Sequence, residues 1–195
     1  MQVKYMKRCY YVESLFPLFL VLLALCSCVT VKPAATLPID SSLKPGLPVY
    51  FRYAFYRHVN QMASDEVMVT EGKPGKIVPF LDHQFKESVF DSQHEKGVGV
   101  FLTGYLKMET PGKYRFKAMA NDGIRVLVNG QLVVHDPAFH SDRFSEVGEV
   151  IIGSSGWYPI TVKYFQRKGT ARLTLYWQPP GAEGFAVVPA EVYGH

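Results

Sequence analysis

The sequence predicts an all-β protein, an antiparallel β-sandwich or barrel, and three observations carry that prediction. Aromatic residues make up 14% of the chain, and their flat rings pack well on a pleated surface. From Val49 onward, short apolar runs alternate with turn residues, without the strand–helix alternation of a parallel sheet. The dipeptide Asn129-Gly130 separates two aliphatic runs, which indicates a hairpin because a type I′ turn needs two positive φ angles.

Eight segments have the composition and period of strands. They are Val49–Arg57, Gly97–Met108, Lys113–Met119, Gly123–Val128, Gln131–His135, Gly148–Ile152, Trp157–Gln166 and Ala171–Trp177. Pro111-Gly112 and Lys168-Gly169 mark further turns. Only Gly75–Phe90 leaves room for a helical turn, so we expect any helix there.

Composition and motifs exclude several other classes of protein. A chain with 48% hydrophobic and 19% charged residues is not disordered. The formal net charge of +4 is too small to require a nucleic-acid partner. No nucleophile elbow, phosphate-binding glycine loop or zinc-protease helix motif is found, and the acidic pair Asp65-Glu66 is interpreted as surface charge. We therefore expect no enzymatic activity, no catalytic residue and no nucleic-acid partner.

The N-terminal segment has the pattern of an export signal. Lys4, Lys7 and Arg8 precede an apolar run of 11 residues, Leu15–Leu25, whereas a membrane-spanning helix needs roughly 20. The following Leu25-Cys26-Ser27-Cys28 resembles the bacterial lipobox, with Cys28 in the place of the lipidated cysteine. An uncleaved N-terminal anchor, or an ordinary secretory signal cut near Val29, are the alternatives.

This resemblance implies a lipoprotein with three parts. Residues 1–27 are the signal peptide, residues 28–45 are the lipidated cysteine and a proline-rich flexible linker, and residues 46–195 are the folded domain. The protein would then be exported and held to a membrane by thioether-linked lipid and palmitate on Cys28. Because Val29 stands where an inner-membrane retention signal has Asp, the outer membrane is favoured in a host with two membranes.

Motifs in the middle and at the end of the chain resemble the PA-14 domain, a β-sandwich shared by anthrax protective antigen, yeast flocculins and some bacterial β-glucosidases. The resemblance covers residues 46–193, with Asn60–His94 poorly matched. The matching segments are Thr103–Leu106, Pro111–Phe116, Asn121–Val133, Gly156–Phe165, Ala171–Trp177 and Val188–Ala190.

The resemblance implies a ligand site at the Asn121-Asp122 turn. In sugar-binding members two consecutive Asp residues hold a Ca²⁺ that binds sugar hydroxyls. Here the pair is Asn121-Asp122, which offers a carbonyl oxygen and one carboxylate, so Ca²⁺ is the cofactor that the resemblance suggests. The alternative is that Asn-Asp-Gly forms a turn without any cation.

The loop after the second aliphatic strand shapes the ligand site in lectin-like members of the family. In this chain it contributes His135, Asp136, Phe139, His140 and Asp142 as candidate ligand-binding residues. Phe139, or Trp157 from a later strand, is suited to stack on the apolar face of a sugar. Two His and two Asp could also bind zinc, although their spacing matches no compact zinc motif.

Three functions follow from these residues and the resemblance. The first is a membrane-anchored module that binds a glycan, with or without calcium. The second is a structural or protein-interaction lipoprotein of the cell envelope, without a small ligand. The third is a hydrolase whose site is spread over several loops. The first is preferred over the second only slightly, because a fold does not by itself convey an activity.

Overall fold

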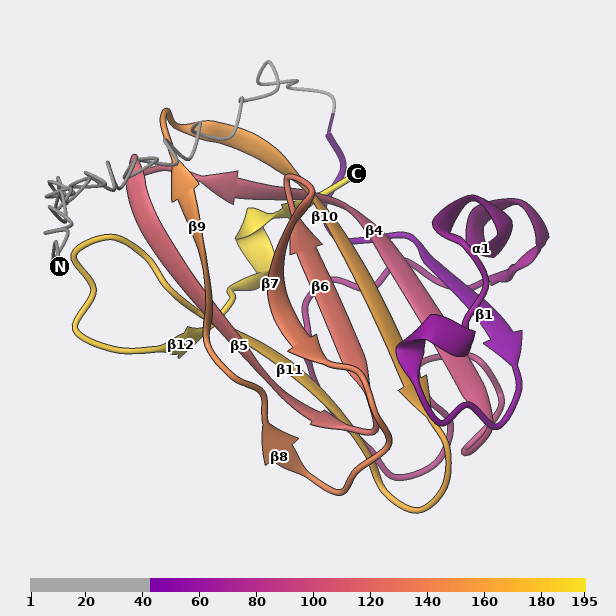
Figure 1. Cartoon of the computed structure of the whole chain (residues 1–195). Coiled ribbons are helices and arrows are strands. Elements are labelled where there is room, and N and C mark those ends of the chain that lie inside the picture. The colour runs from indigo at the N-terminus through magenta and orange to yellow at the C-terminus, as the bar shows by residue number, and fades with distance from the viewer. Residues whose placement is uncertain (1–42) are drawn as a thin grey trace, which may run out of the picture. The chain divides into compact units, whose positions relative to one another are not determined.

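The computed structural model describes residues 43–195, which form two antiparallel sheets packed face to face (Figure 1). The first sheet has seven strands in the order β2-β1-β4-β10-β6-β7, with β13 also pairing with β4. Its strands are β1 (Val49–Tyr53), β2 (Lys73–Pro74), β4 (Val98–Met108), β6 (Ile124–Val128), β7 (Gln131–Asp136), β10 (Gly156–Gln166) and β13 (Tyr193–Gly194).

The second sheet has six strands in the order β12-β11-β5-β8, with β3 beside β11 and β9 beside β5. Its strands are β3 (Asp82–Phe85), β5 (Gly112–Asn121), β8 (Arg143–Phe144), β9 (Gly148–Ile152), β11 (Ala171–Gln178) and β12 (Ala186–Val187). The predicted all-β sandwich is confirmed. The predicted strand Val49–Arg57 is too long, since β1 ends at Tyr53.

The period-2 pattern of the sequence explains which side chains are buried. Along β6, Ile124, Val126 and Val128 are buried while the residues between them are half-exposed, because successive strand residues face opposite sides of a sheet. The β6–β7 hairpin turns at Asn129 and Gly130, whose φ angles are +49° and +74°. Both angles are positive, as the predicted type I′ turn requires.

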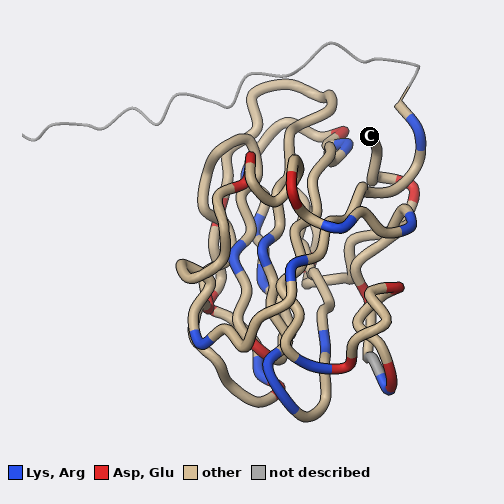
Figure 2. Tube along the Cα trace, turned by 90° about the vertical axis from the view of Figure 1, so that its right-hand side faces the viewer, with Lys and Arg blue, Asp and Glu red and all other residues tan. Residues whose placement is uncertain are grey.

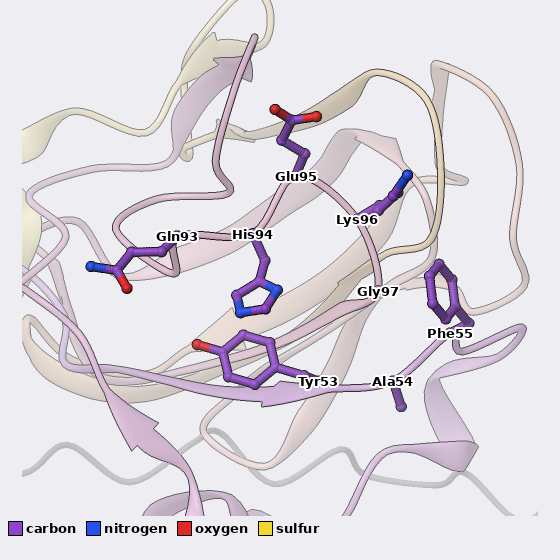
Figure 3. A pocket seen from close by; sticks show the side chains of 8 residues that line it. All are labelled: Tyr53, Ala54, Phe55, Gln93, His94, Glu95, Lys96 and Gly97. Carbon is purple, nitrogen blue, oxygen red and sulfur yellow. The ribbon is translucent and has the colours of Figure 1, made fainter.

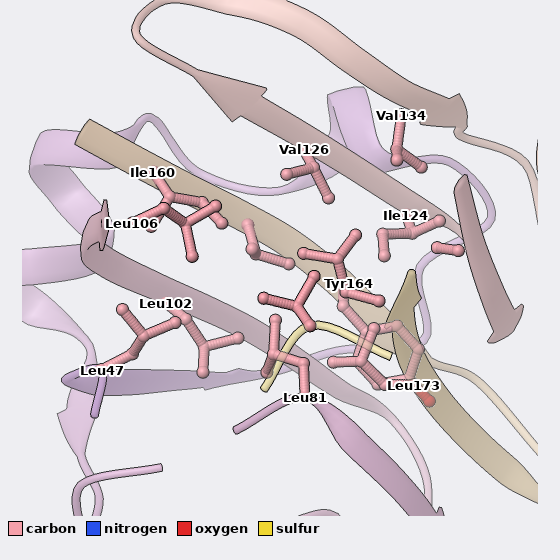
Figure 4. Packing of buried hydrophobic residues seen from close by; sticks show 14 of the residues in the cluster. Leu47, Leu81, Leu102, Leu106, Ile124, Val126, Val134, Ile160, Tyr164 and Leu173 are labelled. Atoms are coloured by element: carbon pink, nitrogen blue, oxygen red, sulfur yellow. The ribbon is translucent and has the colours of Figure 1, made fainter. Parts of the chain in front are cut away.

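The main core fills the space between the two sheets. Figure 4 shows Leu102 of β4, Ile124 of β6 and Leu173 of β11 pointing into this space, and all three are fully buried. The Tyr164 ring of β10 is buried among them. Both inner faces therefore contribute to one continuous core, as expected of a sandwich.

A second, smaller cluster covers the outer face of the first sheet. Helix α1 (Asp65–Glu71) and the 3₁₀ turn η1 (Val59–Gln61) pack there, and the cluster contains Tyr56, Val59, Met62, Met68, Phe101 and Phe165. The buried Lys163 Nζ donates to Asp65 Oδ1 at 2.6 Å and to the Ala63 carbonyl at 2.6 Å, so an ion pair also ties the helix to β10.

The expected place of a helix, Gly75–Phe90, is wrong. That segment contains the strand β3, and the helix lies upstream, at Asp65–Glu71. Ser64 caps it, since its Oγ accepts the Val67 N–H at 3.2 Å, and two acids follow in the first turn. A capping residue followed by acids is an ordinary helix start, and this signal was present in the sequence. None of the helices within residues 43–195 is long and apolar enough to cross a membrane.

The predicted signal peptide, Cys28 and most of the predicted linker lie outside the described residues. At the linker's C-terminal end, the Lys44 N–H donates to the His195 carbonyl at 2.8 Å, and Pro45 forms a bridge with Gly194. The C-terminus and this entry segment therefore lie together at one end of the sandwich. The β5–β6 turn and the β10–β11 loop lie at the opposite end, the lower end of Figure 1. We call it the loop end.

Candidate functional site

The Asn121-Asp122-Gly123 turn joins the two sheets at the loop end. β5 of the second sheet ends at Asn121, β6 of the first begins at Ile124, and the peptide bond between Asn121 and Asp122 is cis. A Cβ added at Gly123 would lie 2.5 Å from the Phe165 ring and 2.6 Å from the Pro137 carbonyl oxygen. Glycine is therefore required here by close packing beneath the turn.

The Asp122 carboxylate connects this turn to two other loops. Its Oδ1 accepts the His140 N–H at 3.2 Å, and its Oδ2 accepts the Arg167 N–H at 2.7 Å. Asp122 is buried, and burial raises the pKa of its carboxyl above the ordinary value, although both amide hydrogen bonds act to lower it. The side chain thus holds the β7–β8 and β10–β11 loops together.

Asn121 is held on both its backbone and its side chain. The Tyr164 hydroxyl, buried beneath the turn, donates to the Asn121 carbonyl oxygen. The Asn121 Nδ2 donates to Asp142 Oδ1 at 2.8 Å and to Thr170 Oγ1 at 3.2 Å. The carboxamide therefore ties the same two loops together from the other side of the turn.

Asp136 forms a charged cluster with Arg143 and His140 of the β7–β8 region. The Arg143 guanidinium donates to both of its carboxylate oxygens, with Nε to Oδ2 at 2.8 Å, and the His140 Nε2 lies 3.2 Å from Oδ2. Burial acts to raise the pKa of the Asp136 carboxyl, but the hydrogen bonds from Arg143 and the nearby charges outweigh it, so the pKa is lowered. Asp136 therefore positions the loop.

A hollow of about 270 Å³ opens beside the turn. It is lined by Asn121, Asp122, Phe139, His140, Ser141, Arg167, Lys168, Gly169 and Thr170. The Phe139 ring is 50% exposed at its rim, with the Arg57 and Arg167 guanidinium carbons 5.8 and 5.5 Å from the ring centre. The rim of the hollow therefore combines a half-exposed aromatic ring with two nearby cations.

The structure brings together part of the predicted site. Asn121, Asp122, Phe139 and His140 line the hollow, and Asp142 contacts it through its hydrogen bond with Asn121. Arg167, Lys168 and Thr170 of the β10–β11 loop also line the hollow but are not among the predicted site residues. The turn signal at Lys168-Gly169 marked this loop, but only the pairing of β10 with β6 places it beside the Asn121-Asp122 turn.

Two predicted residues lie away from the hollow. His135 is exposed and neighbours Arg125 across the β6–β7 pair, while the adjacent Asp136 is buried, because successive strand residues face opposite sides. Trp157 stands near the start of β10, eight residues before Phe165, which corresponds to about 26 Å of strand. It lies at the end of the sandwich opposite the turn.

As its side chains lie here, the oxygens of the turn are largely engaged in hydrogen bonds with the protein. Calcium takes about six to eight oxygen ligands, with carboxylates as the anionic ones. Both Asp122 oxygens accept backbone N–H groups, and the Asn121 amide donates toward Asp142. Within residues 43–195, no three His, Cys, Asp or Glu side chains are grouped so as to hold a metal ion, zinc included. Calcium binding by Asn121 and Asp122 stays a prediction.

Together, the fold and this site define an antiparallel sandwich with a loop-lined hollow at one end. The sequence profile of the PA14 domain matches residues 82–190, more than half of the chain. The chain belongs to the PA14 domain family. No curated protein matches it.

Solved structures of other proteins share the fold. An anti-sigma factor domain-containing protein from Clostridium clariflavum aligns with a TM-score of 0.62 at 16% identity, over 77% of this chain and 47% of that protein. This chain thus spans about half the length of that protein. The PA14 sugar-binding domain of an RTX adhesin gives 0.62 at 19% identity, over 77% and 98%. The epithelial adhesin 9 A domain from Candida glabrata, in complex with Galβ1-3GlcNAc, gives 0.59 at 16% identity, over 84% and 94%.

Proposed function

We propose that this protein is a glycan-binding module, carried on an exported protein that is anchored to a membrane through lipid on Cys28. The observation that carries the proposal is the hollow beside the Asn121-Asp122 turn, with the exposed Phe139 ring at its rim. Two structural neighbours, the RTX adhesin domain and the Candida glabrata adhesin, are a sugar-binding domain and a sugar complex by their own descriptions.

The chemistry of the hollow suits a sugar. A pyranose has an apolar face of C–H groups and a rim of hydroxyls, so it needs a flat ring and several hydrogen-bonding groups. Phe139 offers the ring, while Ser141, Thr170 and the basic side chains of Arg167 and Lys168 offer the polar contacts. Because the three loops are tied together by Asp122 and Asn121, these groups are held in place before a ligand arrives.

The arrangement also favours binding over catalysis. Glycosidases use two carboxyl groups that face the substrate. Among the residues lining this hollow, Asp122 is the sole carboxylate, and both of its oxygens already accept backbone N–H groups.

The direction of the proposed anchor is compatible with this role. The described chain begins beside His195, at the end opposite the hollow. A flexible tether from Cys28 to this point would join the domain at the end away from the hollow.

A second candidate function, contact with an envelope protein, is favoured by a different surface. Phe144, Val147 and Ile151 are 48%, 40% and 39% exposed. They lie in and beside β8 and β9, and among the described strands β9 pairs only with β5. An apolar strand at the edge of a sheet is a common place for another chain to bind.

A glycan array tests both candidates with one pair of variants. We expect the purified protein to bind a subset of glycans, and Phe139→Ala to weaken that binding by about tenfold, since ring contacts of this kind contribute about 1–1.5 kcal/mol. Phe144→Ala is the matched control, because Phe144 is a phenylalanine with nearly the same exposure on a different surface. The array is run with calcium and with a chelator, which also tests the calcium prediction.

The outcomes separate the candidates. Loss of binding in Phe139→Ala but not in Phe144→Ala supports a glycan site at the hollow. An array without any hits contradicts the proposed function. If instead Phe144→Ala abolishes capture of a defined envelope protein while the array stays empty, the second candidate is supported.

A further inference from the structure

A second hollow, of about 550 Å³, lies beside the first at the loop end. Figure 3 shows it between β1 and the segment leading into β4, with the Tyr53 and His94 rings facing each other and Phe55 beside Gly97. The two rings are stacked at 4.1 Å, and the Tyr53 hydroxyl donates to the Ser92 carbonyl at 3.1 Å. This wall of the hollow is therefore held in place.

The two hollows are physically joined. The Gly97 N–H, in the wall of the second hollow, donates to the carbonyl oxygen of Arg167 in the first at 3.2 Å. Lys168 lines the first hollow, and its Nζ lies 5.9 Å from the ring centre of Phe55 in the second. The pair of hollows forms one surface long enough for more than one sugar, within the usual volume range of ligand sites.

Each hollow carries an exposed phenylalanine next to a cation. Phe55 is 56% exposed and Phe139 is 50% exposed, the two largest fractions among the large hydrophobic side chains whose exposure the structure describes. Phe55 lies near Lys168, and Phe139 lies near both Arg57 and Arg167. Exposed rings at the rims of adjoining hollows are suited to stack on the apolar faces of a ligand.

The charge of this surface is cationic. Among the described residues, none of Arg57, Lys96, Arg167 and Lys168 has an acidic partner within salt-bridge distance, and the Arg167 Nε is buried without a hydrogen-bond partner. The acids lining the hollows are Asp122, whose oxygens both accept backbone N–H groups, and Glu95. Figure 2 shows basic segments at the lower end of the sandwich, where the β10–β11 loop lies in Figure 1, with acidic segments among them.

We propose that the ligand is an acidic oligosaccharide that spans both hollows. This inference rests on the proposed glycan-binding function and narrows its substrate class. One sugar stacks on Phe139 and another on Phe55, while a carboxylate, sulfate or phosphate substituent binds between Arg167 and Lys168. Cations on a concave surface raise the local concentration of anions, and a guanidinium forms strong paired hydrogen bonds with such groups.

The first arm of the test compares acidic and neutral glycans. Binding is measured by calorimetry for pairs of oligosaccharides that share a backbone and differ only in one sulfate or uronate group. We expect the acidic member of each pair to bind at least about tenfold more tightly, and its affinity to fall with added salt. Neutral members that bind equally well overturn the inference and leave the proposed function standing. The absence of binding by both members contradicts both.

The second arm tests whether the preference for acidic glycans depends on the cations at the loop end. The double variant Arg167→Gln/Lys168→Gln keeps the backbone N–H that Asp122 accepts, and we expect it to lose the preference for the acidic member. Lys107→Gln/Lys113→Gln is the matched control, since it removes the same charge at the opposite end of the sandwich. Equal loss in both double variants means that only net charge matters, which overturns the inference.

The third arm tests the length of the site and the class of ligand. Phe55→Ala is expected to weaken a long acidic oligosaccharide severalfold and to leave an acidic disaccharide unchanged. An equal loss for both lengths contradicts a ligand spanning both hollows. Polyphosphate and vesicles containing anionic phospholipid are measured alongside, and binding of either as tightly as the oligosaccharide also overturns the inference.

Discussion

The two ends of the sandwich are built from the same long strands, yet the cations beside their hollows differ in whether they have acidic partners. At the end that holds the C-terminus, Lys107 pairs with Glu109 and Lys113 with Glu149, each at 2.9 Å. At the loop end, no such pair is formed by Arg167 or its neighbours Lys168 and Arg57 among the described residues.

The two ends also differ in what their hollows expose. The end with the C-terminus has a hollow of about 410 Å³, but the rings lining it, Tyr114 and Trp177, are buried. Nearby, the Trp157 ring packs so closely on Gly194 that an added Cβ would lie 2.9 Å from it. The hollows at the loop end are bordered by exposed rings and unpaired cations. Volume alone therefore does not distinguish a ligand site, whereas exposed rings and unpaired charge do.

The largest effect is expected from Asp122→Ala, which removes the carboxylate that holds the β7–β8 and β10–β11 loops together. The variant leaves the His140 and Arg167 N–H groups without their acceptor, and each buried donor left unpaired costs about 1–3 kcal/mol. We expect a loss of about 2–4 kcal/mol in the free energy of unfolding, measured by urea denaturation, together with loss of glycan binding.

Asp122→Asn is the matched variant for this prediction. Its single carbonyl oxygen can accept one of the two N–H groups, so an intermediate loss of stability is expected. An Asp122→Ala protein as stable as the parent would contradict the structural role assigned to this carboxylate.

A smaller effect is expected from Trp157→Ala, at the other end of the molecule. Trp157 is half-buried against Gly194, so its removal should lower stability by roughly 1–2 kcal/mol through lost apolar burial. Glycan affinity should stay unchanged when measured below the melting transition. A loss of glycan affinity without a matching loss of stability would instead place Trp157 in the ligand site.

The smallest effect concerns pH and the Asp136 cluster. The pKa of Asp136 is lowered in the folded protein, so the ionised carboxylate stabilises the fold. This contribution is fully present above the ordinary pKa of Asp, about 3.9, and is lost as the pH falls through the lowered pKa. The raised pKa of Asp122 acts in the opposite sense, since its contribution is lost as the pH rises through the raised value.

Asp136→Asn isolates the Asp136 contribution. We expect the variant to lose about 1 kcal/mol at pH 7, since the Arg143 partner is half-exposed, and to lose less further stability on acidification than the parent does. The free energy of unfolding is measured between pH 3 and pH 7. Parallel curves for the two proteins would contradict this assignment.

Much of the fold could be predicted because it depends on local pattern. β6 and β7 follow from alternating burial and from the Asn129-Gly130 turn. The two-residue strands β2 and β8 could not be predicted this way, because they exist only through pairing with distant strands. Helix α1 was missed although Ser64 and the two acids after it form a recognisable start.

The candidate site was predicted only where its residues are close in sequence. Asp122, Phe139 and His140 belong to one hairpin region and were found together. Arg167 is 45 residues from Asp122 and contributes through a backbone N–H, which leaves no mark on the sequence. Phe55 was assigned to the interior of a strand, whereas β1 ends before it and leaves its ring in a loop.

The central claim is that the loop end is the ligand-binding end of the molecule. NMR titration of the ¹⁵N-labelled protein with a glycan identified on the array tests it most directly. We expect amide shifts to change at residues 121–123, 138–142 and 166–170, and to stay unchanged at residues 107–110 and 189–194. Shifts confined to residues 107–110 and 189–194, or to β8 and β9, would contradict it.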